Sequence, residues 1–169
     1  MITNPYDTHL PKTAANYQPL TPITLLERAA ATYPDHIAII HGKARTTYRV
    51  LYERARMLAS ALAQRYIGPG DTVSVMLPNT PAMIEAHFGV PMTGAVLHAI
   101  NTRLDAAIIA FQLDHANCKV LLVDREFSAV IREALALAKV KPFIIDCNDA
   151  EFPHVPGDQG EAMGGGRGH

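Results

Sequence analysis

The chain has 169 residues, of which 49% are hydrophobic and 18% are charged, and its formal net charge is −1. This composition is too apolar for a disordered protein, and a chain of this length forms one domain that buries roughly 70% of its unfolded surface. The balanced charge, without a run of Lys or Arg, excludes a nucleic-acid-binding surface and an anionic-membrane surface.

Residues 1–20 are polar and contain three prolines, so we expect an extended N-terminal arm. The arm lacks an apolar signal core and an Arg-rich amphipathic pattern, and no apolar stretch is long enough to span a membrane. The two cysteines, Cys118 and Cys147, lie beside strand-like runs. Without an export signal we expect two reduced core thiols rather than a disulfide, and a cytoplasmic location.

The first helix is predicted from Thr24-Leu-Leu-Glu27, which fits a capping box, to Tyr33-Pro34, because the residue before a proline avoids the helical region. A strand-like run, His36–His41, follows, with Arg45–Thr47 as its expected hairpin partner. A helical apolar stripe then extends over Tyr48–Tyr66 and stops at Gly68-Pro69-Gly70.

Three βα repeats come next, and each strand is a short apolar run. Thr80-Pro81 and Asp105 are the expected starts of the first two helices, and Leu104 and Ile109 are spaced to form a hydrophobic staple across the second start. The expected strands are Thr72–Leu77, Ala95–Ile100, Lys119–Val123 and Phe143–Ile145, and the last helix has its apolar stripe over Phe127–Ala138.

Strands that alternate with helices predict an α/β fold with a mostly parallel sheet and right-handed crossovers. We therefore expect a globular unit over residues 21–147. Residues 148–169 differ, because six of the eleven glycines fall within 157–169 and no apolar period remains. A flexible Gly-rich tail is expected there.

No glycine-rich stretch is placed to bind a phosphate. Gly164–Gly166 follows the last strand and precedes no helix, while Gly68-Pro69-Gly70 precedes a strand and is expected to be a turn. The turn Leu77-Pro-Asn-Thr-Pro81 lies where ligands bind in open α/β sheets. It has no glycine and its prolines lack N–H donors, so a turn and capping role is favoured.

The histidines do not form a recognisable metal motif. No pair has the i, i+3 or i, i+4 spacing of ligands on a helix, and no His–Cys cluster occurs. His87 and His98 are candidates for lining a pocket, although packing in the core or on the surface is favoured for both. The eight histidines are His9, His36, His41, His87, His98, His115, His154 and His169.

Candidate nucleophiles are also few. Ser60 and Ser74 lie inside regular elements, and Ser128, at a helix start, is expected to cap that helix, so none occupies a strand–turn–helix elbow. Arg103 follows Asn101 in a loop and is a candidate for binding a carboxylate or phosphate, with a structural contact favoured. The residues themselves indicate an α/β domain without an identifiable active site.

Four stretches in order resemble the N-terminal part of the AMP-forming acyl-CoA synthetases, the adenylate-forming or acyl-activating enzymes, over about residues 16–147. The details NYQPLTP, DREFS and ALALAKVKP are most similar to medium-chain and methylmercaptopropionate-type acyl-CoA ligases. No single motif is diagnostic, but the ordered series is specific. The stretches are NYQPLTPITLLERAAATYPDHIAIIHG (16–42), TYRVLYERARMLASAL (47–62), GDTVSVMLPNTPAMIEAHFGVPMTGAVLHAINTRL (70–104) and LDAAIIAFQLDHANCKVLLVDREF (104–127).

The resemblance implies part of the N-terminal domain of the adenylate-forming fold. It also implies, for a full-length enzyme, activation of a fatty or other carboxylic acid with ATP and Mg²⁺ and transfer of the acyl group to coenzyme A. The family's Ser/Thr/Gly-rich ATP loop, its Tyr-x-x-Thr-Glu segment, the ribose-binding Asp and the C-terminal lid with its catalytic Lys have no equivalent here. No lysine of this chain is expected to replace that catalytic Lys, because all of them lie in the part that matches the N-terminal region of the family. The lysines are Lys12, Lys43, Lys119, Lys139 and Lys141.

No catalytic, cofactor-binding or metal-binding residue is therefore assigned, and the chain is expected to be a partial acyl-CoA ligase that is inactive alone. The alternative is a non-catalytic α/β interaction or binding module. Apolar sheet or helix faces left bare by lost neighbours would recruit partners or cause self-association, whereas a monomer would indicate an autonomous module.

Overall fold

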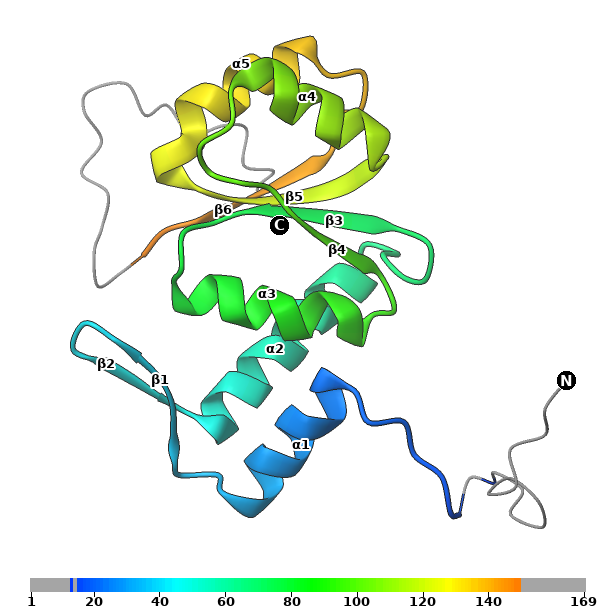
Figure 1. Cartoon of the computed structure of the whole chain (residues 1–169), viewed down its shortest axis with the longest axis vertical. Helices are drawn as coiled ribbons and strands as arrows, with labels where there is room; N and C mark the ends of the chain where they lie inside the picture. Colours follow the sequence, from blue (N-terminus) through cyan, green and yellow to red (C-terminus); the bar gives the residue numbers. More distant parts are fainter. Residues whose placement is uncertain (1–12, 14, 150–169) are drawn as a thin grey trace, which may run out of the picture.

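In the computed structural model, residues 13 and 15–149 are described. One layer of four strands separates two groups of helices, and a small hairpin lies beside them (Figure 1). The helices are α1 (Pro22–Thr32), α2 (Tyr48–Ala63), α3 (Pro81–Met92), α4 (Ala106–His115) and α5 (Ser128–Leu137), with a 3₁₀ turn, η2 (Arg125–Phe127), before α5. The strands are β1 (Ile37–His41), β2 (Ala44–Thr47), β3 (Thr72–Met76), β4 (Val96–Ala99), β5 (Cys118–Asp124) and β6 (Phe143–Cys147).

The main sheet has the order β4-β3-β5-β6, and all of its neighbouring strands are parallel, as predicted. The chain moves from β3 to β4 on one side and then returns to place β5 and β6 on the other. The order therefore reverses between β3 and β5. In open α/β sheets the carboxyl ends of the strands at such a reversal form a crevice in which ligands bind.

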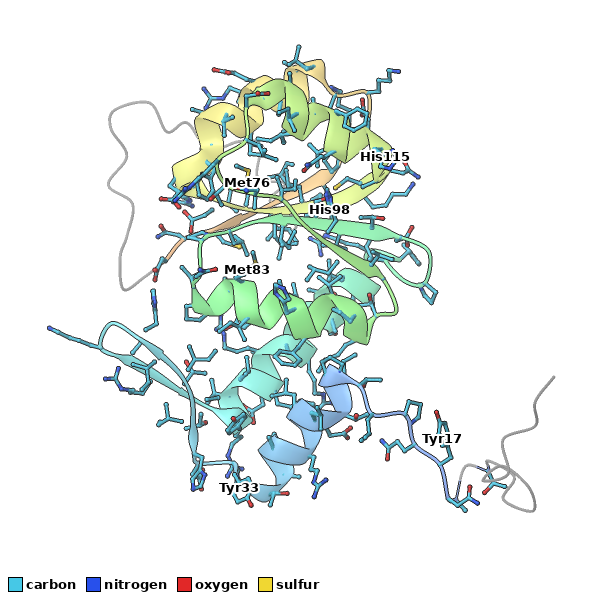
Figure 2. All side chains as sticks on the ribbon, viewed as in Figure 1. Tyr17, Tyr33, Met76, Met83, His98 and His115 are labelled. Atoms are coloured by element: carbon cyan, nitrogen blue, oxygen red, sulfur yellow. The ribbon has the colours of Figure 1, made fainter. Side chains whose placement is uncertain are left out.

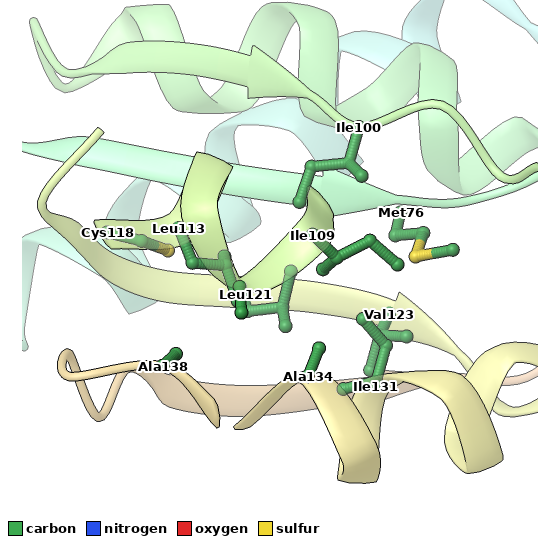
Figure 3. Close-up of a cluster of buried hydrophobic side chains, with 11 residues drawn as sticks. Met76, Ile100, Ile109, Leu113, Cys118, Leu121, Val123, Ile131, Ala134 and Ala138 are labelled. Carbon is green, nitrogen blue, oxygen red and sulfur yellow. The ribbon is translucent and has the colours of Figure 1, made fainter. Parts of the chain in front are cut away.

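Helices cover both faces of this sheet, which explains why its strands are apolar runs rather than alternating patterns. Figure 2 shows Met76 on the side of α4 and α5, and Met83 on the side of α3. On the first side, Leu113 of α4 and Ile131 of α5 converge with Leu121 of β5 in a cluster that excludes solvent (Figure 3).

More helices cover the other face of the sheet. There Leu62 of α2 and Val90 of α3 pack against Val73 and Val75 of β3. Helix α1 packs against α2 through Leu26, in a third cluster. The β1–β2 hairpin adds Ile39 to that cluster. The hairpin, α1 and α2 therefore form an outer layer over α3 (Figure 1).

Most predicted element ends are close to the observed ones, but the predicted start of the first helix is wrong. The N-cap is Thr21, not Thr24, and Thr24 occupies the third helical position. The Thr21 hydroxyl accepts from the Thr24 N–H at 3.2 Å, and the Thr24 hydroxyl accepts from the Thr21 N–H at 3.0 Å. Pro22 favours this earlier start because its fixed φ suits the first helical position, where no N–H is needed.

Asp105 caps α4 through its side chain, as predicted. Thr80 is the N-cap residue of α3, as predicted, but its side chain makes no capping hydrogen bond. The helix beginning at Tyr48 ends at Ala63, three residues before its predicted end. The predicted cap by Ser128 is wrong. Ser128 is the first residue of α5, and its hydroxyl donates to the Arg125 carbonyl at 2.7 Å instead of accepting from the helix. The 3₁₀ turn before α5 explains this difference, because it supplies the entry to the helix.

The predicted turn at Gly68-Pro69-Gly70 is confirmed, and Gly70 has a φ of +90° that a side chain would disfavour. Both cysteines are free thiols, as expected. Residues 1–12, 14 and 150–169, which hold most of the expected arm and tail, lie outside the described residues. None of the helices in the described part has the length and apolar character needed to cross a bilayer.

Candidate functional site

A cavity of about 420 Å³ opens at the carboxyl ends of β3, β5 and β6, at the point where the strand order reverses. The turn predicted to occupy a ligand-binding position, Leu77–Pro81, contributes Thr80 and Pro81 to its wall. The hairpin and the first half of α2 close the opposite side. The lining residues are His41, Ala44, Thr46, Val50, Arg54, Thr80, Pro81, Ala82, Glu85, Asp124, Cys147, Asn148 and Asp149.

The strongest polar contact in this wall joins Arg54 of α2 to Glu85 of α3. Arg54 Nε donates to Glu85 Oε1, and Arg54 Nη2 donates to Glu85 Oε2 at 3.0 Å. The Glu85 side chain is only 10% exposed, whereas the Arg54 side chain is 52% exposed. The bidentate hydrogen bond to Glu85 raises the pKa of Arg54, so the guanidinium stays charged and compensates the buried carboxylate.

A second side-chain contact joins the hairpin to the segment that follows β6. His41 Nε2 lies 2.6 Å from Asp149 Oδ2, and both side chains are largely buried. Asp124, buried at the end of β5, accepts from the Glu126 N–H at 3.1 Å and thereby begins the 3₁₀ turn. Three carboxylates, on Glu85, Asp124 and Asp149, therefore line a cavity whose wall also holds the Arg54 guanidinium and the His41 imidazole.

Cys147 is the one thiol in this wall, and its pKa is raised to about 11 by burial, then by the charges of Asp124, Asp146 and Glu85. It is therefore protonated at neutral pH. Since the thiolate is the nucleophile and the metal ligand, Cys147 is suited to neither role. Burial also raises the pKa of Cys118, which lies in the core between the sheet and α4.

The amino end of α3 offers few donors to an anion. Pro81 has no N–H, and the N–H groups of Met83 and Ile84 already bond the Thr80 carbonyl, at 3.1 and 3.4 Å. The carboxylates of Asp124 and of Glu85, the latter paired with Arg54, line the same wall.

Neither of the two histidines considered as pocket residues, His87 and His98, lines this cavity. His87 is exposed on α3, and its Nδ1 lies 2.8 Å from the Met83 carbonyl of its own helix. His98 is half-buried and lies on β4 (Figure 2). Its Nδ1 is 3.0 Å from the hydroxyl of Ser74 on β3. Ser74 is fully buried, so it does not reach a substrate.

The remaining candidates also have structural positions. Ser60 lies on the exposed side of α2, and Arg103 has an exposed side chain while its N–H donates to Asn101 Oδ1 at 2.9 Å. Gly164–Gly166 lies outside the described residues. Within residues 13 and 15–149, no group of three His, Cys, Asp or Glu side chains is arranged to hold a metal ion.

Two features of the cavity were missed by the sequence analysis, namely the Arg54–Glu85 and His41–Asp149 pairs. Glu85 carries a signal, because it is the single carboxylate on an otherwise apolar helix. Its partner, Arg54, lies 31 residues earlier, on another helix. His41 and Asp149 are separated by 108 positions in the sequence. No local spacing predicts contacts over such separations.

The profile of the AMP-binding enzyme family matches residues 26–163. The chain belongs to this family. It is 52% identical over 132 residues to the peroxisomal acetate/butyrate–CoA ligase of Arabidopsis thaliana, covering 78% of this chain and 23% of the relative. It is 49% identical over 128 residues to the acetate–CoA ligase of Humulus lupulus, covering 76% of this chain and 22% of that relative.

Solved structures agree with these sequence matches. A benzoate CoA ligase from Burkholderia xenovorans superposes with a TM-score of 0.70 at 26% identity, covering 75% of this chain and 25% of that one. A putative long-chain-fatty-acid CoA ligase from Rhodopseudomonas palustris gives a TM-score of 0.68 at 31% identity, covering 79% and 35%. The α/β fold expected from the resemblance is confirmed, and the chain spans about a quarter of the length of its curated relatives.

The half-buried position of His98 is expected to make the stability of the chain dependent on pH. Burial lowers the pKa of His98, and the charge of His115 lowers it further. In the unfolded chain the pKa of this histidine is about 6.5. At pH values between about 6.5 and the lower pKa of the folded state, the unfolded chain therefore binds more protons than the folded chain does. We expect full stability above about pH 6.5 and a loss as pH falls below it.

Urea unfolding of the chain at pH 7.5 and pH 5.5 measures this loss. A His98→Asn variant, which retains a polar partner for Ser74 but does not titrate, should show a smaller difference between the two pH values. An undiminished difference in the variant would assign the pH dependence to other groups.

Proposed function

We propose that this chain carries the first sheet unit of an acyl-CoA ligase and does not form an acyl-adenylate alone. The observation behind the proposal is the cavity at the strand-order reversal. It is lined by three carboxylates, two of them paired with Arg54 and His41, and by the start of α3, where Pro81 has no N–H to donate to a phosphate. The family's glycine-rich ATP loop also has no counterpart in the 169 residues.

In a complete ligase the reaction begins with a carboxylate, which is a poor electrophile. Transfer of AMP to it creates a good leaving group, and the thiol of coenzyme A then takes the acyl group. The charge on ATP requires Mg²⁺ and preorganised donors during this transfer. We propose that residues of this chain support the sheet of such an enzyme, and that ATP, Mg²⁺ and coenzyme A are bound by groups outside it.

The substrate class that we propose for the complete enzyme is a small or fatty carboxylic acid. The names of the Arabidopsis and Humulus relatives specify acetate or butyrate for those proteins. A role in fatty acid metabolism is part of the same proposal.

An ATP–pyrophosphate exchange assay on the purified 169-residue chain tests this proposal. We expect no exchange above background with acetate, butyrate, benzoate or longer fatty acids, while the full-length Arabidopsis acetate/butyrate–CoA ligase serves as the positive control. Calorimetric titration with MgATP and with coenzyme A should give no heat of binding. Sustained exchange by the chain alone, or a stoichiometric nucleotide, would refute the proposal.

A second candidate function is a non-catalytic interaction module that binds neither nucleic acid nor a membrane. It is favoured by Phe111 and Ile108, which are exposed side by side on α4. Size-exclusion chromatography with thermal unfolding distinguishes the candidates. A monomer with a sharp transition supports an autonomous module, whereas association supports a unit that needs the rest of a ligase.

The compartment is likewise a proposal. The reduced state expected for the two cysteines favours the cytoplasm, whereas the Arabidopsis relative is named as peroxisomal. Imaging of a fluorescent fusion of the full coding region distinguishes a diffuse signal from a punctate one.

A further inference from the structure

The cavity at the strand-order reversal contains a buried carboxylate that has no cationic partner. Asp124, the last residue of β5, is only 6% exposed and lies in the cavity wall. Its Oδ1 accepts from the Glu126 N–H at 3.1 Å, and within residues 13 and 15–149 no Lys, Arg or His side chain pairs with it. A buried carboxylate without a compensating charge is costly, so this group favours a positively charged ligand.

The charged groups of the whole wall leave the cavity negative. Arg54 neutralises Glu85 through its bidentate contact, and His41 contacts Asp149. Even with His41 protonated, the part of the wall that the structure describes would hold three carboxylates against two cations. The charge that remains uncompensated is therefore negative, and a partly enclosed wall of this sign attracts cations.

A second acceptor in the wall is not used by the fold. Thr80 is 8% exposed and is the N-cap of α3, but its hydroxyl accepts no hydrogen bond from that helix. The hydroxyl donates to the Pro78 carbonyl at 3.5 Å, so the lone pairs of Thr80 Oγ1 have no donor among the described residues. Thr80 and Asp124 follow neighbouring strands, because Met76 of β3 is in register with Val123 of β5. The same edge of the sheet therefore offers two oxygen acceptors.

The rest of the wall indicates which kind of cation fits. Its volume of about 420 Å³ is within the range of small-molecule sites, and Ala44, Val50 and Ala82 give it an apolar part. A metal ion needs several ligands, and the described part of the chain has no group of three His, Cys, Asp or Glu side chains arranged to hold one. An alkylammonium ion instead donates three hydrogen bonds and packs its chain on apolar side chains.

We propose that this cavity is a binding site for a primary alkylammonium ion. The ammonium group donates to Asp124 Oδ2 and to Thr80 Oγ1, and the alkyl chain lies against Val50 and Ala82. Binding of such an ion is independent of the proposed function, because no nucleotide and no acyl transfer takes part in it.

Titration of the isotope-labelled 169-residue chain with n-butylammonium chloride tests this site through the amide chemical shifts in NMR spectra. We expect saturable shifts of the amides of Thr80 and Asp124, with a Kd on the order of 1 mM for so small a ligand. The alcohol n-butanol has the same chain without the charge and should bind at least about tenfold more weakly. Butyrate, which has the opposite charge, should not bind.

Two variants assign the contacts. Asp124→Asn removes the charge but keeps an oxygen that accepts from the Glu126 N–H, and it should weaken butylammonium binding at least about tenfold. Thr80→Val removes the hydroxyl with little change of shape and should weaken binding by about three- to tenfold. The matched control is Asp35→Asn, which removes an 84% exposed carboxylate outside the cavity and should bind as the unchanged chain does.

Three results would overturn the proposed site: no saturable binding of butylammonium, equal affinities for butylammonium and n-butanol, or a loss from Asp35→Asn as large as the loss from Asp124→Asn. The last result would assign the binding to the net charge of the protein. The two ligands are compared on the unchanged chain, so that comparison decides between the outcomes even if Asp124→Asn does not fold.

Discussion

Replacing Gly89 by Ala lowers the free energy of unfolding by about 2–3 kcal/mol, although alanine is the better helix former by about 1 kcal/mol. Gly89 lies within α3, where α2 crosses it. An added Cβ would lie 2.8 Å from the Ala55 carbonyl oxygen and 2.9 Å from Leu58 Cδ2. Ala55 is fully buried, so relief of the clash requires the two helices to separate.

Urea unfolding of Gly89→Ala beside Gly68→Ala measures the effect. Gly68 has no positive φ, and its added Cβ would find its nearest neighbour, the Thr93 carbonyl oxygen, at 3.8 Å. We expect the Gly68 variant to remain within about 0.5 kcal/mol of the unchanged chain. Equal stability of the two variants would show that the α2–α3 crossing adjusts without strain.

The second large effect is expected at the Arg54–Glu85 pair, where the two partners differ in burial. Arg54→Met leaves a largely buried carboxylate without its partner and should destabilise the fold by about 2–4 kcal/mol. Glu85→Gln leaves a guanidinium that is half exposed and can be hydrated, so a smaller loss of about 1–2 kcal/mol is expected. The double variant should be more stable than the sum of the single losses predicts, because neither charge remains unpaired.

The exposed pair of Arg49 and Asp35 provides the control. Arg49 Nη2 lies 3.1 Å from Asp35 Oδ1, but the two side chains are 54% and 84% exposed. Arg49→Met should therefore change stability by less than about 1 kcal/mol. A loss from Glu85→Gln that exceeds the loss from Arg54→Met would contradict the assignment of the buried charge to Glu85.

Local patterns in the sequence predicted the main elements because their causes are local. The apolar run at Lys119–Val123 requires a sheet covered on both faces, and β5 is the strand that packs under helices on each side. Asp105 caps α4 as predicted, with its Oδ1 accepting from the Ile108 N–H at 2.9 Å. Leu104 and Ile109 pack in the same cluster, consistent with the predicted staple.

The start of α1 shows where local reasoning fails. Thr21 and Thr24 are both acceptable N-cap residues, and Glu27 at the right spacing favoured the second. In the structure Pro22 selects the first, and Thr24 takes the place that Glu or Gln holds in the usual capping box. The signal that separates the two starts is therefore Pro22, which the spacing of Thr24 and Glu27 outweighed in the prediction.

The sequence by itself determined the parallel α/β class, the order of helices and strands, and the membership in an acyl-activating family, because periodicity, caps and ordered motifs are carried by neighbouring residues. The tertiary structure alone decided that Leu77–Pro81 borders an acidic cavity, that Arg54 neutralises Glu85, and that α4 keeps an apolar face in solvent while α3 does not. Each of these features depends on residues that the fold brings together from distant parts of the chain. Their spacing along the sequence does not predict such contacts.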